Sequence, residues 1–290
     1  MTVQKIGYLG PKGTFTKMAV DSLFEGGEFV SYDTIPACLD AVEQGEIDTG
    51  VVPLENAIEG SVHLTIDYLI HQVNQAIIAE LTVPIRQHLL THPDYMGEEI
   101  TEIHSHSHAI AQCHQYLHKH YPNAEIYYTA STGRAAEIVR EKGPHAVAIG
   151  NHLAAEMNEL KIMESNIHDY DNNHTRFAVV QKDPKTLKVK EHPVAKQKTT
   201  VMVTLPQDYV GALHQVLAAF AWRKMNLSKI ESRPMKTGLG NYFFLVDVDQ
   251  PYDKVLFPGV QQELEALGCK LKVLGTYPSY EIEVPTPVTK

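Results

Sequence analysis

Strand-like and helix-like segments alternate through roughly the first 180 residues, and this alternation constrains the fold more than any other feature of the sequence. Short apolar runs, such as residues 6–9 and 146–149, are each followed by apolar residues at helical spacing. The clearest helical pattern follows Ser61, where apolar residues recur three or four positions apart up to Val73. Alternation of this kind predicts an α/β domain with a largely parallel sheet.

A change in composition divides the chain. Residues 182–198 contain six lysines, two prolines and few apolar side chains, and such a segment cannot form a core. We interpret residues 183–198 as a linker. It would join a domain at 1–182 to a smaller domain at 199–280, followed by a tail at 281–290.

The smaller domain has a different order of elements. β-Branched and aromatic residues predict strands, and helical spacing around Leu217 and Leu264 predicts two helices. The order is βαββαβ, which is that of the ferredoxin-like motif, and this motif serves many functions. The four expected strands cover residues 199–205, 227–232, 242–248 and 271–274.

Charge and hydropathy exclude some classes of function. The formal net charge is −10, which disfavours nucleic acid as a partner. No apolar run approaches the roughly 18 residues of a membrane span, so we expect no membrane association. The first residues lack the pattern of a signal peptide, and we therefore expect a cytoplasmic protein.

Cysteine and histidine do not predict a metal site. The cysteines lie far apart without a C-x-x-C spacing, and we interpret them as small buried hydrophobes. His104, His106 and His108 alternate, so on a strand they would point to opposite sides, and no carboxylate or cysteine pair completes a ligand set. The glycines near the N-terminus fit neither a Walker A loop nor a dinucleotide-binding motif. The cysteines are Cys38, Cys113 and Cys269.

Small hydroxyl residues recur where predicted strands give way to helices. A helix N-terminus offers free N–H groups and partial positive charge, and in open α/β sheets ligands bind beyond the carboxyl ends of the strands. The pattern therefore favours a small anionic ligand, although serine and threonine are also ordinary helix caps. The residues concerned are Thr14, Thr16, Ser61, Ser105, Ser107, Ser131 and Thr132.

The segment 171–180 is a polar loop that runs into an apolar strand, with Thr175 and Arg176 at its mouth. An arginine fork suits a carboxylate. Composition alone, however, favours a plain loop with a surface ion pair.

Several motifs together resemble the prephenate dehydratase family. Asn173-x-Thr175-Arg176-Phe177 is similar to the signature of that family, and residues 10–16 and 53–62 resemble its two earlier motifs. Gly211-Ala212-Leu213 and residues 230–234 resemble the phenylalanine-binding motifs of the ACT regulatory domain fused to such enzymes. The resemblance covers essentially the whole chain, in order. The chain departs from the family pattern at Lys17 and at Ser107-His108.

The resemblance implies a monofunctional enzyme of phenylalanine biosynthesis, a lyase that converts prephenate to phenylpyruvate with loss of water and carbon dioxide. The catalytic domain would have two lobes like a type II periplasmic binding protein. One lobe would comprise residues 1–79 with 160–182, and the other residues 80–159. No cofactor is expected, because aromatisation of the ring drives the reaction and no electron sink is needed.

The resemblance also implies roles for individual residues. Thr175 would be catalytic, as a positioned hydrogen-bond donor, and Arg176 would anchor a substrate carboxylate. Glu55 is a candidate acid if its surroundings raise its pKa. The expected substrate-binding residues are Arg176, Thr14, Glu55, Asn56, Ser131 and Phe177.

The ACT domain implied by the resemblance would bind L-phenylalanine as an allosteric effector between paired domains, so we expect a homodimer or homotetramer. Arogenate dehydratase, which shares these motifs, and a non-catalytic sensor of aromatic acids remain as alternative functions. The expected effector-binding residues are Gly211, Ala212, Leu213, Asn226, Leu227, Glu231, Ser232, Arg233 and Pro234.

Overall fold

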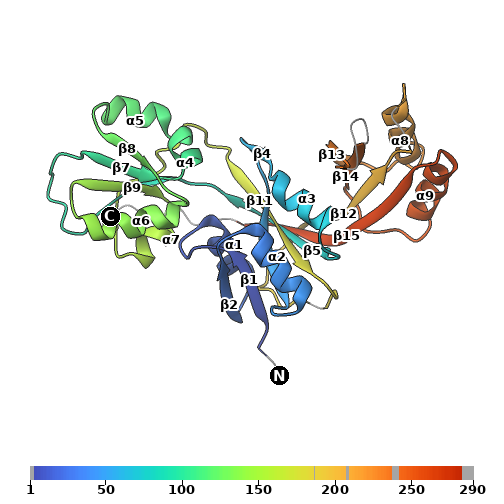
Figure 1. Ribbon diagram of the computed structural model, residues 1–290, viewed down its shortest axis with the longest axis horizontal. Helices are drawn as coiled ribbons and strands as arrows, with labels where there is room; N and C mark the ends of the chain where they lie inside the picture. Colours follow the sequence, from blue (N-terminus) through green and yellow to red (C-terminus); the bar gives the residue numbers. More distant parts are fainter. Residues whose placement is uncertain (1–2, 186, 207–208, 237–241, 283–290) are drawn as a thin grey trace.

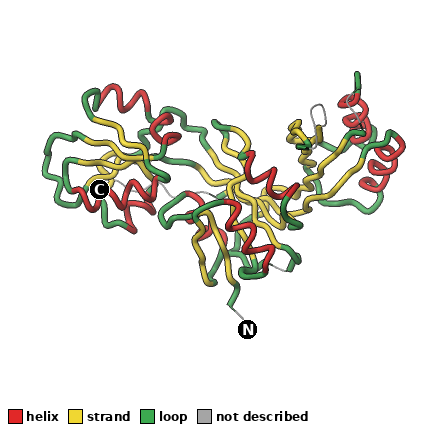
Figure 2. Tube along the Cα trace, in the orientation of Figure 1, coloured by secondary structure: helices red, strands yellow, loops and turns green. Residues whose placement is uncertain are grey.

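A computed structural model of the chain describes residues 3–185, 187–206, 209–236 and 242–282. The chain forms an elongated molecule of three parts: a second lobe at one end, a first lobe in the middle and a C-terminal domain at the other end (Figure 1). Strands run through all three parts, and helices cover their outer faces (Figure 2).

The first lobe is built from the two ends of the segment 1–182. Its helices α1 and α2 begin at capping threonines, Thr14 and Thr34, whose side chains accept backbone N–H bonds. Its elements are β1 (Lys5–Leu9), α1 (Phe15–Leu23), β2 (Glu28–Tyr32), α2 (Ile35–Gln44), β3 (Thr49–Asn56), β4 (Gly60–Ser61), α3 (His63–His71), β5 (Ala76–Pro84) and β11 (His174–Gln181).

The second lobe has its own five-stranded sheet, in the order β10-β6-β9-β7-β8. The chain enters this lobe after β5 ends at Pro84 and leaves it before β11 begins at His174. The first crossing, at Pro84, lies five residues beyond the expected boundary at 79. The second boundary lies between residues 164 and 174 rather than at 160, because β10 pairs with β6 of the second lobe. The elements are β6 (His88–Thr91), β7 (Glu102–Ser105), α4 (Ser107–Gln112), α5 (His114–His120), β8 (Glu125–Tyr128), α6 (Thr132–Lys142), β9 (Ala146–Gly150), α7 (His152–Met157) and β10 (Lys161–Glu164).

The sheets are mixed rather than largely parallel. Strand β1 is parallel to β2 and β3, and β7 is parallel to β8 and β9. Strand β11, however, is antiparallel to both of its neighbours, β3 and β5, because it returns from the second lobe in the opposite direction. The expected α/β class is confirmed. The sheets are not largely parallel, because β11 returns antiparallel in the first lobe and β6 pairs antiparallel with β9 and β10 in the second.

The C-terminal domain has the βαββαβ order expected from its sequence. Its strands pair antiparallel in the order β13-β14-β12-β15, with α8 and α9 packed together. The elements are β12 (Val194–Thr204), α8 (Ala212–Ala221), β13 (Leu227–Pro234), β14 (Tyr242–Val248), α9 (Leu256–Ala266) and β15 (Lys270–Glu281).

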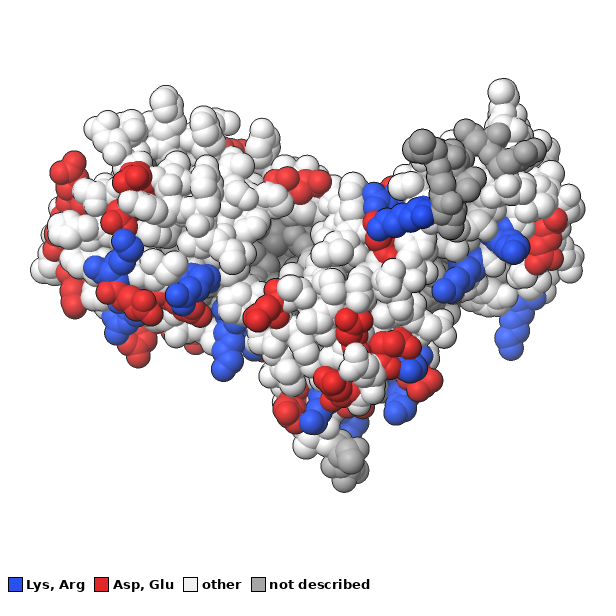
Figure 3. Space-filling model, viewed as in Figure 1, with Lys and Arg blue, Asp and Glu red and all other residues white. Residues whose placement is uncertain are grey.

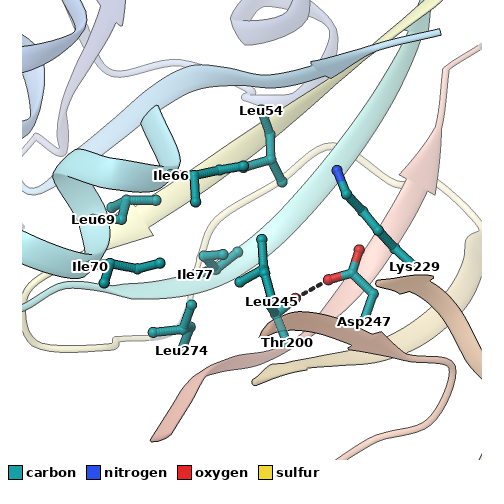
Figure 4. A pocket seen from close by; sticks show the side chains of 10 residues that line it. All are labelled: Leu54, Ile66, Leu69, Ile70, Ile77, Thr200, Lys229, Leu245, Asp247 and Leu274. Atoms are coloured by element: carbon teal, nitrogen blue, oxygen red, sulfur yellow. Dashed lines mark hydrogen bonds between the residues drawn. The ribbon is translucent and has the colours of Figure 1, made fainter. Parts of the chain in front are cut away.

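The first lobe and the C-terminal domain share one ten-stranded sheet. Ser279–Glu281 of β15 pairs in parallel with Glu80–Thr82 of β5, and β12 already begins at Val194, within the segment expected as a linker. An apolar core also crosses the junction, where Leu245 and Leu274 pack with Ile66 and Ile77 (Figure 4). The two units therefore form a single structural body rather than domains on a flexible tether.

The remaining composition-based expectations concern the interior and membranes. The cysteines Cys38, Cys113 and Cys269 are all buried, as expected. Within the described residues, no helix is both long and apolar enough to span a bilayer.

Candidate active site

A cleft of about 810 Å³ lies between the two lobes. Figure 3 shows the surface hollowed between the second lobe and the first, with mostly uncharged side chains around the hollow. The first lobe contributes Thr14, Asn56 and Ser61, and the second lobe contributes His106 and Ser131. The loops of both lobes meet here because each lies beyond the ends of its sheet.

Helix N-termini converge on this cleft. Thr14 caps α1, Thr34 caps α2 and Ser131 caps α6, and all three line it. The first residues of α3 line it as well. Each N-terminus directs partial positive charge and free N–H groups toward the same space, so the cleft suits a ligand with more than one negative charge.

None of the described residues that line the cleft is a lysine or an arginine. The titratable groups there are the carboxylates of Asp33 and Glu59 and three histidines, His63, His106 and His108. Charge complementarity to an anion therefore comes from backbone N–H groups, hydroxyls and imidazoles.

His106 presents a defined hydrogen-bond donor. Its Nδ1 accepts the backbone N–H of His108 at 3.3 Å, which leaves Nε2 to carry the proton of the neutral ring. Burial and the neighbouring His108 lower the pKa of His106, against an opposing effect of Glu59. His106 is thus a neutral imidazole with an available N–H near pH 7.

Thr175 lies in a fixed hydrogen-bond network. It is 8% exposed, and its hydroxyl accepts from Asn56 Nδ2 at 2.9 Å. The Asn56 amide is itself oriented, since Nδ2 also donates to Asn173 and Oδ1 accepts the backbone N–H groups of Ile58 and Glu59. The Thr175 hydroxyl therefore keeps its own hydrogen for a ligand in the cleft.

The structure brings most of the expected substrate-binding residues to the cleft. Thr14, Asn56, Ser131 and Phe177 line it together with Thr175. Phe177 is two residues from Thr175 on β11 and so lies on the same face, where it is 1% exposed and packs as a wall.

Arg176 lies elsewhere than expected. It follows Thr175 on β11, so its side chain leaves the opposite face of the strand. Its guanidinium pairs with Glu55 Oε2 at 2.6 Å, with Asp247 Oδ2 of the C-terminal domain at 2.8 Å and with Glu80. Burial alone would lower the pKa of Arg176, but Glu80 and Asp247 raise it. Arg176 is a buried counter-ion and does not line the cleft.

Glu55 also lies outside the cleft, beside Arg176. Its carboxylate pairs with Arg176 and, at 3.0 Å, with Lys229 of β13, and it is absent from the cleft lining. Burial would raise the pKa of Glu55, but Lys229 and Arg176 lower it. The raised pKa that would make Glu55 an acid is therefore not found, and the group is held as a carboxylate.

The expected effector-binding residues lie on two separate elements. Gly211, Ala212 and Leu213 form the start of α8, where Gly211 is the cap with φ of 88°. The remaining residues lie on β13 or just before it. Glu231 and Arg233 face the first lobe, whereas Asn226, Ser232 and Pro234 are exposed, because strand side chains alternate.

Some residues of the cleft were missed by sequence reasoning. Thr34, Glu59, His63 and Gln112 line it without having been named as site residues. Thr34 and His63 lie at helix starts, and Glu59 belongs to the motif at residues 53–62. These sequence features could have identified all three residues. No group of three histidine, cysteine or carboxylate side chains gathers as metal ligands within the described ranges.

Comparison with known proteins gives one consistent family. A model of the family described as "Prephenate dehydratase" matches residues 6–185. The prephenate dehydratase of Bacillus subtilis is 54% identical over 284 residues, which cover 96% of this chain and 100% of that protein.

Two solved structures are similar to nearly the whole chain, and one of them carries the same family name. A prephenate dehydratase from Arthrobacter aurescens in complex with L-Phe has 34% identity and a TM-score of 0.79, covering 94% of this chain and 89% of that one. A protein described as GqqA, a novel type of quorum quenching acylase, has 26% identity and a TM-score of 0.80, covering 95% of this chain and 98% of that one.

Proposed function

Since the chain belongs to the prephenate dehydratase family, we propose that its interlobe cleft is the site where prephenate loses water and carbon dioxide to give phenylpyruvate. The observation that carries this proposal is the Thr175 hydroxyl, which belongs to a buried residue that lines the cleft and is oriented by Asn56. The substrate carries two carboxylates, and the converging helix N-termini suit such a dianion.

The reaction breaks two bonds of one ring. The C–O bond to the ring hydroxyl breaks as a proton reaches that oxygen, and water leaves. The C–C bond to the ring carboxylate breaks, its electron pair enters the ring, and carbon dioxide leaves. The product ring is aromatic, so the enzyme needs chiefly to orient the substrate and assist the leaving oxygen.

Thr175 donates its free hydrogen to the leaving oxygen. A threonine hydroxyl is no stronger an acid than water, so the proton consumed in the reaction must come from hydronium of the solvent. As Thr175 donates its hydrogen to the leaving oxygen, its own oxygen takes a proton from a protonated water, so Thr175 acts as a relay. His106 Nε2–H is a second donor, which would hold a carboxylate or the leaving oxygen from the facing lobe.

Arg176 already pairs with carboxylates of the protein, so other groups must bind the carboxylates of the substrate. With its guanidinium bound to Glu55, Glu80 and Asp247, Arg176 would stabilise the fold behind Thr175. Carboxylate recognition would fall to the N-termini of α1 and α6 with Thr14 and Ser131. Weak contacts of this kind also suit catalysis, because a tight ion pair on the departing carboxylate would stabilise the ground state.

The first experiment measures turnover of prephenate and of arogenate by the purified chain, for the wild type and for Thr175→Val. This change keeps the shape of threonine and removes the hydroxyl. We expect prephenate to be the better substrate and the variant to lose about 10²-fold or more in kcat. Thr204→Val, on β12 of the C-terminal domain, is the matched control and should retain activity.

Three results would contradict this proposal. Normal turnover by Thr175→Val would remove the cleft from the mechanism. Faster turnover of arogenate would favour arogenate dehydratase. Binding of an aromatic acid without turnover of either substrate would favour the sensor.

The C-terminal βαββαβ unit would be an ACT domain that binds L-phenylalanine and inhibits the enzyme. Support comes from the element order, from the L-Phe complex of the Arthrobacter relative, and from the open space around Gly211 at the start of α8. Inhibition by L-phenylalanine should weaken about tenfold or more in Gly211→Val, because a β-branched residue is strained at positive φ. An unchanged inhibition curve would contradict this assignment.

The assembly would be a homodimer or homotetramer formed through this domain. Val210, Leu213, Trp222 and Ile230 are exposed there in the single chain, and apolar side chains gathered on one unit are typical of an interface. Light scattering after size-exclusion chromatography measures the mass, and a monomer at micromolar concentration would contradict this expectation.

A further inference from the structure

Ser61 lines the cleft but is bonded to the C-terminal domain. Its hydroxyl lies 2.6 Å from Glu231 Oε2 and 2.7 Å from Lys229 Nζ. A serine hydroxyl has a single hydrogen, and a carboxylate can only accept, so this hydrogen is donated to Glu231. The ammonium of Lys229 can only donate, so the Ser61 oxygen accepts from it.

Lys229 and Glu231 belong to one row of side chains. They alternate with exposed residues on β13 and therefore face the first lobe, as Arg233 does further along the strand. Figure 4 shows Lys229 projecting from its strand toward the first lobe beside the apolar junction. Arg233 pairs with Asp67 of α3 at 2.8 Å, and Glu231 also lies 3.7 Å from His63, another residue of the cleft.

The two charged partners act on Ser61 in opposite ways. Glu231 takes the hydrogen that Ser61 would otherwise offer to an anion in the cleft. Lys229 polarises the hydroxyl, which makes it a better donor, and places a cation directly behind it. Both are mostly buried, with side-chain exposures of 13% for Lys229 and 17% for Glu231, so their charges are weakly screened.

We propose that Ser61 is a substrate-binding residue for a carboxylate of the dianion, and that Glu231 and Lys229 are positioning residues that set its availability in opposite directions. The anion and Glu231 compete for one hydrogen, so the substrate must turn the hydroxyl away from β13. This inference rests on the cleft being the dehydratase site. It makes the C-terminal domain a part of the substrate-binding apparatus, since Glu231, a residue of the expected effector segment, lies behind the cleft in contact with Ser61 and His63.

The proposal predicts opposite changes from two residues on the same strand. Glu231→Gln keeps the size of the side chain but offers a weaker, uncharged acceptor, so the KM for prephenate should fall about threefold. Lys229→Met keeps the apolar stem but removes the cation, so KM should rise about fivefold or more. In both variants kcat should stay within about twofold, since uniform binding changes KM alone.

Ser61→Ala tests whether both effects pass through the hydroxyl. In this background, Glu231→Gln and Lys229→Met should each change KM by less than about 1.5-fold. Glu263→Gln is the matched control. Glu263 is also paired with an arginine, Arg223 at 2.6 Å, but on α9 of the same domain, away from the cleft. Its KM should equal that of the wild type.

The outcomes separate this inference from the proposed function. If Thr175→Val abolishes turnover but Glu231→Gln leaves KM unchanged or raises it, the cleft is the site and the role of Glu231 is refuted. The role would also be refuted if Glu231→Gln and Lys229→Met changed KM as much in the Ser61→Ala background as in the wild type. Glu231 and Lys229 would then act on KM without the Ser61 hydroxyl. Normal turnover by Thr175→Val would overturn the site itself. Should Lys229→Met fail to fold, Glu231→Gln with and without Ser61→Ala decides the matter alone.

Discussion

Thr175 and Arg176 are neighbours in the chain, yet their side chains leave β11 on opposite faces. Thr175 enters the cleft, and Arg176 enters a buried cluster with Glu55, Glu80 and Asp247. The period of two in a strand requires this separation. One short motif thus supplies both a hydroxyl donor in the cleft and the counter-ion on the opposite face of the same strand.

Glu80 gives a prediction at this scale. It is 1% exposed and pairs with Arg176 and, at 2.8 Å, with Lys198. Burial would raise its pKa, but these cations lower it below the ordinary value near 4.3. Its contribution to stability is therefore complete above that ordinary value and is lost as the pH falls through the lower, folded pKa.

Glu80→Gln should accordingly be most destabilising near pH 6, by about 3–5 kcal/mol, because it removes the carboxylate that pairs with buried Lys198 and one of the three that pair with Arg176. The difference from the wild type should narrow at pH 3. Urea unfolding followed by circular dichroism at both values measures it, with Glu263→Gln as a surface control. A difference that does not change with pH would show that the charge of Glu80 is unimportant.

Helix N-termini decide the chemistry of the cleft at the scale of elements. Helices α1, α2 and α6 come from different parts of the sequence, but their capping residues meet around one space. Each capping side chain accepts one N–H group at the start of its helix and leaves further N–H groups for a ligand. The sequence pattern of hydroxyl residues at strand ends is therefore explained by capping, and the proposed anion binding would use the N–H groups that the caps leave free.

Ser131 allows the two roles to be separated. Its Oγ accepts the backbone N–H of Arg134 at 3.1 Å, and both asparagine and aspartate are good replacements for such a cap. Ser131→Asp and Ser131→Asn should have similar stabilities. The KM for prephenate should be at least about tenfold higher for Ser131→Asp, because it adds a negative charge facing the dianion. Equal KM values would mean that the start of α6 does not contact the substrate.

The shared sheet is the dominant feature at the scale of the whole molecule. It continues from the C-terminal domain through β15 and β5 into the first lobe, whereas the second lobe has a separate sheet. The buried pairs of Arg176 with Asp247 and of Glu80 with Lys198 cross the same junction. The first lobe and the C-terminal domain should consequently unfold as one unit.

Each part contains one buried cysteine, which offers a direct test. Cys38 lies in the first lobe, Cys113 in the second lobe and Cys269 in the C-terminal domain. In variants that retain a single cysteine, Cys38 and Cys269 should become reactive toward a thiol reagent at the same urea concentration. Cys113, in the second lobe with its separate sheet, can become reactive at a different urea concentration. Labelling of Cys269 at a clearly lower concentration than Cys38 would show that the C-terminal domain unfolds independently.

The sequence by itself determined the local features: the alternating elements of the lobes, the βαββαβ order, the capping hydroxyls and the motifs that identify the family. These depend on neighbouring residues, and so they can be deduced from periodicity and composition. The face on which Arg176 lies, the carboxylates that hold it, and the bonding of Ser61 to Lys229 and Glu231 were decided only by the tertiary structure. Such contacts join residues between 71 and 170 positions apart, and their formation depends on which strands pair at the junction, which no local pattern specifies.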